Sequence, residues 1–428
     1  AGGGGAPHCA ARSAKRTSLE SGVDISMNSV PDHQNLRGKN QLKTAGVVPL
    51  LKPSLWPAKE SIQESTQQEL LPQWDVACKA VDEEHRTSSA SLRAVACTSD
   101  AVITASSKPI VKVWKVAEGK VVETQKLRHG AVGSSCVEVA DSSSLVAVCA
   151  DDGGIGLWDL RTQKRSGELH ASLPTAWKAK FTADGNRLVS GGPSGVLNFW
   201  DLRNQALMCE ISPEVPRDGR DAKRRRSDSR SAEATAGRRA SNCVFSLAMS
   251  GDGRLLGCGR GNGMLCVMRL EDQEWVSHVQ AHRGEHAVPV RGLAFDASSR
   301  LLLSGGDDHH ACVLDAASMA RSRPDRSLAS PQLERFSAHR GWVTSCSVCP
   351  DPLRHLLVTT SWDSTVKLWD YRAQALVSTY KEHTDSVMAC AFQPSQGQFF
   401  VTVGVDAHIV LHVAKEQSQA LVPVNKTT

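Results

Sequence analysis

Short stretches of alternating apolar and polar residues recur along the chain from residue 73 to residue 413. The stretch Val366-Lys367-Leu368 shows the pattern, and the intervals between stretches carry Gly, Asp, Ser and Asn. Side chains of a β-strand point to opposite faces in turn, so a period of two indicates a strand with one buried face. The pattern therefore predicts an all-β fold built from many short strands.

The strands fall into a longer repeat that ends in a Trp-Asp pair. Three such pairs close a run of strands, at Trp158-Asp159, Trp200-Asp201 and Trp369-Asp370. Weaker copies of the pair are Trp114-Lys115, Met268-Arg269, Leu314-Asp315 and His412-Val413. A four-strand unit that ends in Trp-Asp about every 40 to 45 residues is typical of a propeller blade. The closing positions predict a seven-bladed WD-repeat β-propeller with a disordered N-terminal tail.

A propeller ring usually closes by pairing one terminus of the chain into the last blade. Little strand pattern remains after His412, whereas Gln73 to Val81 has the pattern of an extra strand before the first blade. We therefore predict that this segment is the outer strand of blade seven.

The domain organisation follows from composition and from two long intervals in the repeat. The first 70 residues are rich in Gly, Ser, Gln and Pro and are too polar to bury the apolar surface that folding needs. The predicted parts are a disordered tail at 1–70, the propeller at 71–415, a basic disordered insertion at 213–241, a shorter loop insertion at 318–333 and a flexible C-terminus at 416–428.

Composition also narrows the class of protein. No stretch approaches the roughly 18 uninterrupted apolar residues of a membrane span, so we expect a soluble, intracellular protein without membrane contact. The 13 cysteines lie mostly inside apolar runs, which favours buried reduced thiols over disulfides. Cys346 and Cys349 form a lone CxxC on a strand, where side chains three apart point to opposite faces. We expect no metal and no cofactor.

Polar residues recur at fixed distances before the closing position. An Asp lies six residues earlier, a Ser or Thr lies ten residues earlier, and a His stands near the start of the inner strand. We expect each set to form a hydrogen-bonded network inside its blade. The predicted sets are His339, Thr359, Asp363 and Trp369 in blade six, His286, Ser304 and Asp308 in blade five, and His383, Thr402 and Asp406 in blade seven.

The same residue types could instead form a nucleophile, a base and an orienting acid, as in a propeller hydrolase. A catalytic set occurs once in a fold, whereas this set recurs in several blades. The sequence also holds no Gly-rich phosphate loop, paired-carboxylate motif or HExxH motif. We therefore predict a binding platform and not an enzyme.

The order of the motifs resembles the small WD-repeat subunit that the superkiller complex shares with the polymerase-associated-factor transcription elongation complex. The resemblance covers residues 73–413 and includes Trp-Lys in place of Trp-Asp in blade one. It lies in Ile110-Val111-Lys112-Val113-Trp114-Lys115, Ala176-Trp177, Gly195-Val196-Leu197-Asn198-Phe199, His286-Ala287-Val288-Pro289-Val290-Arg291, Trp342-Val343 and Val403-Gly404-Val405-Asp406-Ala407-His408-Ile409.

The resemblance implies a non-enzymatic scaffold for protein–protein interaction in mRNA decay with the exosome, in transcription elongation, or in both. Its partners would be a tetratricopeptide-repeat scaffold subunit and a helicase of the superkiller complex, or subunits of the polymerase-associated-factor complex. The resemblance also implies a protein of the nucleus and the cytoplasm.

In each blade, the loop that carries the His (the His loop) and the turn that carries the Asp must lie at the same end of the ring, because the two side chains contact each other. We expect large side chains at this end. In blade six, two indoles lie close in sequence to His339 and Asp363. In blades three, five and seven, a large side chain lies four residues before the Phe of the inner strand. Trp, Arg and Met are enriched in interfaces, although some of these side chains could plug the central channel instead. The predicted partner-binding residues are Trp177, Arg291, Trp342, Trp362 and Met388.

The opposite end of the blades carries three Trp-Asp-x-Arg boxes, with Arg161, Arg203 and Arg372. The boxes resemble those of substrate receptors for cullin-RING ubiquitin ligases, which is the alternative function. Arg is also an ordinary turn residue after Trp-Asp in WD repeats, and this interpretation is favoured.

The basic insertion carries nearly all of the chain's formal charge of +5, with nine basic residues against five acids between Glu214 and Ser241. Its run Lys223-Arg224-Arg225-Arg226 fits a short nuclear-import signal, and a merely solvated loop is an equal alternative. The rest of the propeller is close to neutral, which speaks against direct nucleic-acid binding by its body.

Overall fold

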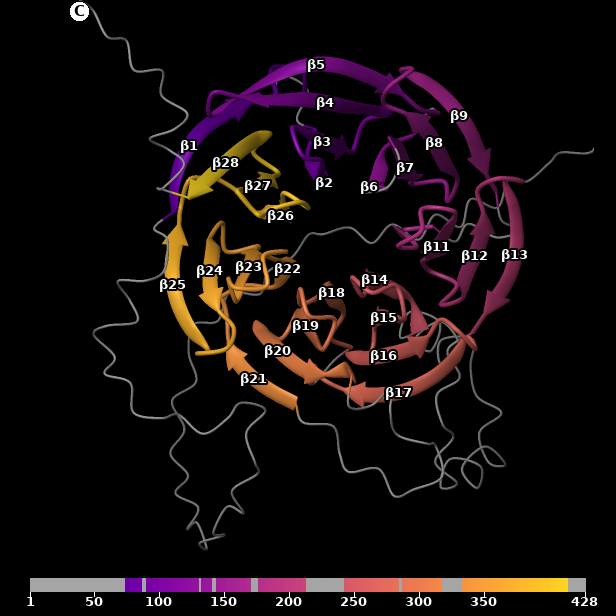
Figure 1. Ribbon diagram of the computed structural model, residues 1–428. Helices are drawn as coiled ribbons and strands as arrows, with labels where there is room; N and C mark the ends of the chain where they lie inside the picture. The colour runs from indigo at the N-terminus through magenta and orange to yellow at the C-terminus, as the bar shows by residue number, and fades with distance from the viewer. Residues whose placement is uncertain are drawn as a thin grey trace, which may run out of the picture. The chain divides into compact units, whose positions relative to one another are not determined.

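The computed structural model places seven antiparallel sheets of four strands each around a central channel, as the blades of a propeller (Figure 1). The predicted seven-bladed fold is therefore confirmed. The structure describes residues 74–86, 90–130, 132–140, 144–170, 176–212, 242–284, 287–317 and 333–414. The predicted tail at 1–70, the basic insertion at 213–241 and the C-terminal segment at 416–428 lie outside the described residues.

Each blade runs from an inner strand at the channel to an outer strand at the circumference. Blades one to four comprise β2 (Leu92–Cys97), β3 (Ala101–Ser106), β4 (Ile110–Ala117) and β5 (Lys120–Arg128); β6 (Ser134–Val139), β7 (Leu145–Ala150), β8 (Ile155–Asp159) and β9 (Lys164–Leu169); β10 (Lys178–Phe181), β11 (Arg187–Gly191), β12 (Leu197–Asp201) and β13 (Ala206–Ile211); and β14 (Val244–Met249), β15 (Leu255–Arg260), β16 (Met264–Arg269) and β17 (Glu274–Gln280).

Blades five to seven comprise β18 (Val290–Phe295), β19 (Leu301–Gly306), β20 (His310–Asp315) and β21 (Leu333–Ser337); β22 (Val343–Val348), β23 (Leu356–Ser361), β24 (Val366–Asp370) and β25 (Ala375–Tyr380); and β26 (Val387–Phe392), β27 (Phe399–Gly404), β28 (His408–Ala414) and β1 (Trp74–Val81). Leu333 starts β21, so the loop predicted at 318–333 runs one residue too far.

The first strand of the described chain closes the ring, as predicted. β1 pairs antiparallel with β28, from Trp74 opposite Ala414 to Val81 opposite His408. The Trp74 ring anchors this strand, since its centroid lies 5.9 Å from that of Phe392 and 5.3 Å from that of Phe400. The sequence repeat is thus offset by one strand from the blade, because every predicted closing position lies in the third strand of its sheet.

The core lies between neighbouring blades, so the middle strands are buried on both faces. All six residues of β19, β23 and β27 are buried. This explains why each of these three strands begins with three consecutive apolar residues. The short helix α2 (Glu83–Arg86) leads from β1 into blade one. No helix in the described ranges is long and apolar enough to cross a membrane.

Candidate functional site

Four polar side chains of blade six form one chain of hydrogen bonds. His339 Nε2 lies 2.8 Å from the Thr359 hydroxyl, and the Trp369 indole N–H donates to the same hydroxyl at 2.9 Å. His339 Nδ1 lies 3.3 Å from the Asp363 carboxylate. Burial lowers the pKa of His339, although Asp363 opposes the shift. The set ties a loop, two strands and a turn of one blade together, which is a structural role.

Blade five has the same network but takes its histidine from another position. His282 lies 2.8 Å from the Asp308 carboxylate and 2.9 Å from the Ser304 hydroxyl. The prediction that His286 makes these contacts is wrong, and His286 itself lies outside the described residues. The prediction assumed that this loop is as short as the one between His339 and β22 of blade six, but the loop between His282 and β18 is four residues longer. The pair Ala281-His282, which matches Ala338-His339 of blade six, was the better signal for the histidine of this network.

Blade seven replaces the indole of the network with an imidazole. His383 lies 3.0 Å from the Asp406 carboxylate and 2.9 Å from the Thr402 hydroxyl. His412 Nε2 lies 3.4 Å from the same hydroxyl, and its ring stacks on Phe400 at 4.3 Å and 9°. Burial lowers the pKa of His412 to about 3, so this ring is neutral near pH 7.

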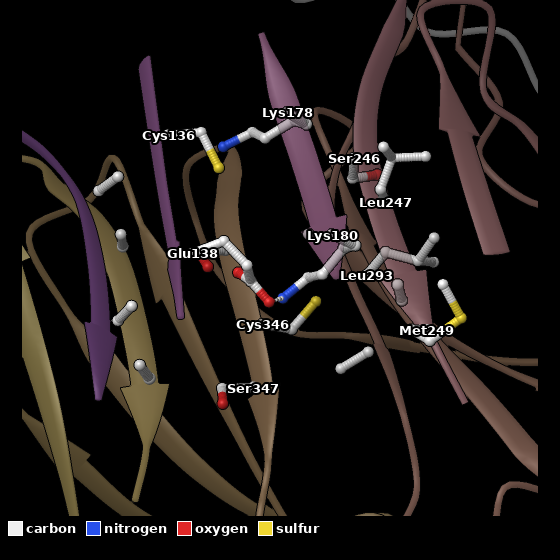
Figure 2. A pocket seen from close by; sticks show the side chains of 18 of the residues that line it. Cys136, Glu138, Lys178, Lys180, Ser246, Leu247, Met249, Leu293, Cys346 and Ser347 are labelled. Carbon is white, nitrogen blue, oxygen red and sulfur yellow. Dashed lines mark hydrogen bonds and ion pairs between the residues drawn. The ribbon is translucent and has the colours of Figure 1, made fainter. Parts of the chain in front are cut away.

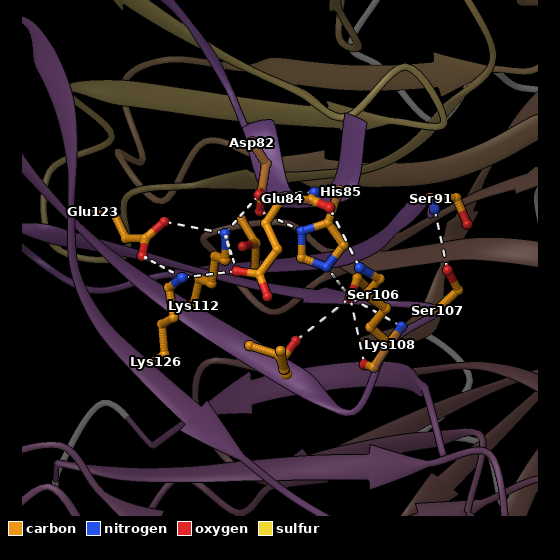
Figure 3. Close-up of polar contacts among 12 residues, drawn as sticks. Asp82, Glu84, His85, Ser91, Ser106, Ser107, Lys108, Lys112, Glu123 and Lys126 are labelled. Carbon is orange, nitrogen blue, oxygen red and sulfur yellow. Dashed lines mark hydrogen bonds and ion pairs between the residues drawn. The ribbon is translucent and has the colours of Figure 1, made fainter. Parts of the chain in front are cut away.

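Blade one contains a buried charged cluster that the sequence reasoning missed (Figure 3). The Lys112 ammonium is 2% exposed and lies 2.6 Å from Asp82, 3.1 Å from Glu123 and 3.3 Å from Glu84. His85 joins the cluster, 2.6 Å from the other oxygen of Asp82. Two features of the sequence could have predicted this cluster: Lys112 inside an otherwise apolar strand, and the acidic run Asp82-Glu83-Glu84 before blade one.

A β-bulge re-aims one side chain at the start of six of the described inner strands. The register shifts around the second residue of each strand, which is left out of the ladder. The bulged residues are Arg93, Ser135, Phe245, Arg291, Thr344 and Met388. Because the His loops lead into these strands, the bulged residues stand at the same mouth of the channel as the His loops.

Five side chains at this mouth contact one another in sequence around the ring. The Trp177 and Phe245 ring centroids lie 5.5 Å apart. The Arg291 guanidinium lies 5.6 Å from the Phe245 centroid and 5.2 Å from the Trp342 centroid. Trp342 and Trp362 are 4.2 Å apart with 31° between their planes. We call these five residues the rim arc; it spans blades three to six.

A carboxylate fixes the cation at the centre of the rim arc. Arg291 Nε and Nη2 donate to the two oxygens of Asp307, at 2.5 Å and 2.9 Å. Burial raises the pKa of Asp307, and the bonds from Arg291 oppose this shift. Such a bidentate pair sets the plane of the guanidinium, which then faces two aromatic rings. Its side chain is 27% exposed, so the cation is held in place and still reaches solvent.

The five members of the rim arc are half-buried. The structure brings Trp177, Arg291, Trp342 and Trp362 to one mouth of the channel, where the sequence analysis placed them. Met388 stands at the same mouth on blade seven, outside the arc. Phe245 was missed because Met249 takes the place of the Phe that marked the other blades.

The three Trp-Asp-x-Arg boxes form ordinary hairpin turns at the opposite end of the blades. The backbone N–H of Arg161, Arg203 and Arg372 donates to the Asp two residues earlier, at 2.8, 2.9 and 2.9 Å. A Gln with positive φ follows each Arg by two residues. The Arg203 side chain donates to Asn186 at 3.2 Å, and that of Arg372 donates to His355 at 2.9 Å.

The residues of the proposed import signal, 223–226, lie outside the described residues.

Most cysteines of the described chain are buried thiols. None of the 12 described cysteines forms a disulfide, and ten of them are buried. Cys346 and Cys349 of the CxxC are both buried and belong to different clusters of core residues. Among the described residues, no group of three or more His, Cys, Asp or Glu could hold a metal ion.

Comparison with protein families agrees with the offset of the repeat from the blade. Residues 275–315, 330–370 and 374–412 match the WD domain, G-beta repeat. The chain carries WD repeats. Each match joins the outer strand of one blade to the three inner strands of the next.

Curated relatives match the chain at low identity. The chain is 28% identical over 235 residues to the WD repeat-containing protein VIP3 of Arabidopsis thaliana, which is 53% of this chain and 66% of the relative. It is 23% identical over 336 residues to a ribosome biogenesis protein WDR12 homolog of Chlamydomonas reinhardtii, 73% of this chain and 71% of the relative. It is 24% identical over 272 residues to the guanine nucleotide-binding protein subunit beta of Saccharomyces cerevisiae, 63% of this chain and 53% of the relative.

The match to VIP3 spans just under two thirds of that relative's length. The names include a ribosome biogenesis protein and a G-protein subunit, so the relatives support a propeller scaffold and do not single out one complex.

Proposed function

We propose that this propeller is a non-enzymatic scaffold that holds a protein partner on the rim arc. The observation that carries the proposal is the fixed cation of Arg291 between Phe245 and Trp342, bound by Asp307. Interface hot spots are enriched in Trp, Tyr and Arg and lie in well-packed, preorganised positions. A surface of this composition gains affinity because little side-chain freedom is lost on binding.

The resemblance in sequence suggests which partner this is. We infer that the chain is a WD-repeat subunit of the superkiller complex, of the polymerase-associated-factor complex, or of both. The direct contact is then a tetratricopeptide-repeat subunit in the first complex. A protein that serves both complexes works in the nucleus and the cytoplasm.

The alternative functions gain no support from the geometry. The His, Ser, Thr and Asp side chains expected of a propeller hydrolase bond to one another inside the blades. The arginines of the ligase-receptor boxes stand in hairpin turns, and two of them bond within their own blade. These arrangements are explained by the fold itself.

Affinity purification of the tagged full chain tests the proposal. Trp342→Ala should lower the recovery of the tetratricopeptide-repeat subunit strongly, by roughly thirtyfold in affinity if it removes 2 kcal/mol. Leu353→Ala is the matched control, because Leu353 is 86% exposed in the loop at the opposite end of the same blade. Equal recovery by both variants would contradict the rim as the binding site. Recovery of a cullin adaptor, lost on changing Arg161 and Arg203, would favour the ligase receptor instead.

A further inference from the structure

Two pairs of cysteines face each other across neighbouring strands of the propeller. Cys136 of β6 lies directly opposite Cys149 of β7, and Cys258 of β15 lies directly opposite Cys266 of β16. Directly opposed residues of antiparallel strands have Cα atoms about 4.5 to 5.5 Å apart and side chains on one face. A disulfide needs a Cα separation of about 4.4 to 6.8 Å. Both pairs, which are free thiols, therefore have the backbone placement of a disulfide.

The two pairs differ in access from the channel. Cys136 is 7% exposed and lines the central cavity, which has a volume of about 480 Å³. Cys258 and Cys266 are both 0% exposed in the core between blades. A small solute in the channel can therefore reach Cys136 of the first pair, whereas Cys149 and both thiols of the second pair are buried.

A cation also stands beside the first pair. Lys178 of the adjacent inner strand β10 lines the same cavity, and Figure 2 shows its side chain reaching toward Cys136. The hydrogen bond from the Cys149 thiol lowers the pKa of Cys136, burial opposes this, and the Lys178 ammonium lowers it further. At the second pair, burial raises the pKa of Cys258 and raises that of Cys266 to about 11.

We propose that Cys136 and Cys149 form a redox-active dithiol that hydrogen peroxide or a small organic hydroperoxide, entering through the channel, converts to a disulfide. This modification site is independent of the rim arc. It stands on the opposed register of the two cysteines, the opening of Cys136 to the cavity and the neighbouring ammonium of Lys178.

The reaction has two steps. The Cys136 thiolate attacks one oxygen of hydrogen peroxide, an S–O bond forms, the O–O bond breaks, and hydroxide leaves and takes up a proton as water. The sulfur, now a sulfenic acid, has lost two electrons to the peroxide. Cys149 then attacks this sulfur; an S–S bond forms, the S–O bond breaks, and the departing oxygen leaves as water with the Cys149 proton. One peroxide and two thiols give one disulfide and two waters.

Mass spectrometry of the native full chain tests the proposal. The protein is exposed to graded hydrogen peroxide, the remaining thiols are blocked in denaturant, and the digest is searched for cross-linked peptides. We expect a Cys136–Cys149 cross-link, at a rate at least about tenfold above that of the Cys258–Cys266 control pair. In Cys149→Ser, dimedone should trap a sulfenic acid on Cys136. Equal rates at the two pairs, or no reaction at Cys136 at doses that oxidise the half-buried Cys78 and Cys209, would overturn the proposal.

A second variant keeps the test open if Cys149→Ser does not fold. Lys178→Gln leaves both thiols in place and should slow oxidation of Cys136 about three- to tenfold, because less of the thiol is ionised. Its melting temperature serves as the control for folding. An oxidation rate equal to that of the wild type in a folded Lys178→Gln variant would show that the cation has no part in the reaction and would overturn the assigned mechanism.

Discussion

Blade one and blade six place their chemically distinctive side chains in opposite directions. In blade one the charges turn inward: Lys112 is 2% exposed and lies among the carboxylates of Asp82 and Glu123. In blade six the inward set is the network of His339, Thr359, Asp363 and Trp369, which we call the tetrad. Trp342 and Trp362 of the same blade stack on each other at the rim. We therefore expect changes in the buried cluster to alter stability, and changes in the half-buried stacked rings to alter partner binding.

The largest loss of stability is expected from Lys112→Met. This change leaves the buried carboxylate of Asp82 without its ammonium partner, and breaking a buried ion pair in this way destabilises by about 3 to 5 kcal/mol. Partner binding at the rim should be unaffected below the melting temperature. Chemical denaturation followed by circular dichroism measures the loss.

Lys126→Met is the matched control for Lys112→Met. Lys126 contacts Glu84 at 2.7 Å and Glu123 at 3.5 Å, but its side chain is 46% exposed. Exposed ion pairs contribute about 0 to 1 kcal/mol, so this variant should be nearly as stable as the wild type. If the two lysine variants had the same stability, the inward cluster of blade one would not be a stabilising feature.

A smaller loss is expected from Asp363→Ala in blade six. The change removes the carboxylate beside His339 and takes away the acceptor of the Arg340 and Thr365 backbone N–H groups, which costs about 1 to 3 kcal/mol. Asp385→Ala, in an exposed turn of blade seven, should stay within about 0.5 kcal/mol of the wild type. A melting temperature of Asp363→Ala equal to that of the wild type would remove the tetrad from the list of stabilising features.

The smallest effect at neutral pH is expected from His412→Phe in blade seven, which should cost less than about 1.5 kcal/mol because the ring is retained. Its main effect is on pH dependence. Burial lowers the folded-state pKa of His412 to about 3 from its ordinary 6.5, so the unfolded chain binds a proton that the folded chain does not. The wild type therefore loses stability as pH falls from about 6.5 toward 3, and His412→Phe should lose less. Equal slopes for the two proteins over this window would contradict a buried neutral His412.

The fold could be predicted because its signal is periodic. Every closing position, even the degenerate Met268 and His412, lies in a third strand, and the closing strand β1 was recognised by its pattern. The errors came from loop length: the longer loop of blade five shifted the histidine from His286 to His282. The repeat reports how long each connection is, but it does not report where the histidine stands within a longer connection.

Four of the five members of the rim arc could be predicted, but the contacts between them could not. Trp342 and Trp362 were predicted to lie at one mouth because they are close in sequence to His339 and Asp363 of the tetrad, whereas Phe245 was missed. The contact between Arg291 and Phe245 joins two blades, and no spacing within one repeat reports how neighbouring blades meet. The Lys112 cluster was missed for a related reason, since Asp82 belongs to the connection that follows blade seven's outer strand.

The measurement that most directly tests the rim as a partner site is a pair of numbers on Trp362→Ala. Its affinity for the purified tetratricopeptide-repeat subunit is measured by calorimetric titration, and its melting temperature is measured on the same sample. We expect affinity to fall by roughly thirtyfold or more, because truncating a hot-spot Trp commonly removes about 2 kcal/mol or more. The melting temperature should stay close to that of the wild type, because Trp362 lies outside the tetrad. Retained affinity with a lowered melting temperature would contradict the proposal and show that this indole supports the propeller instead.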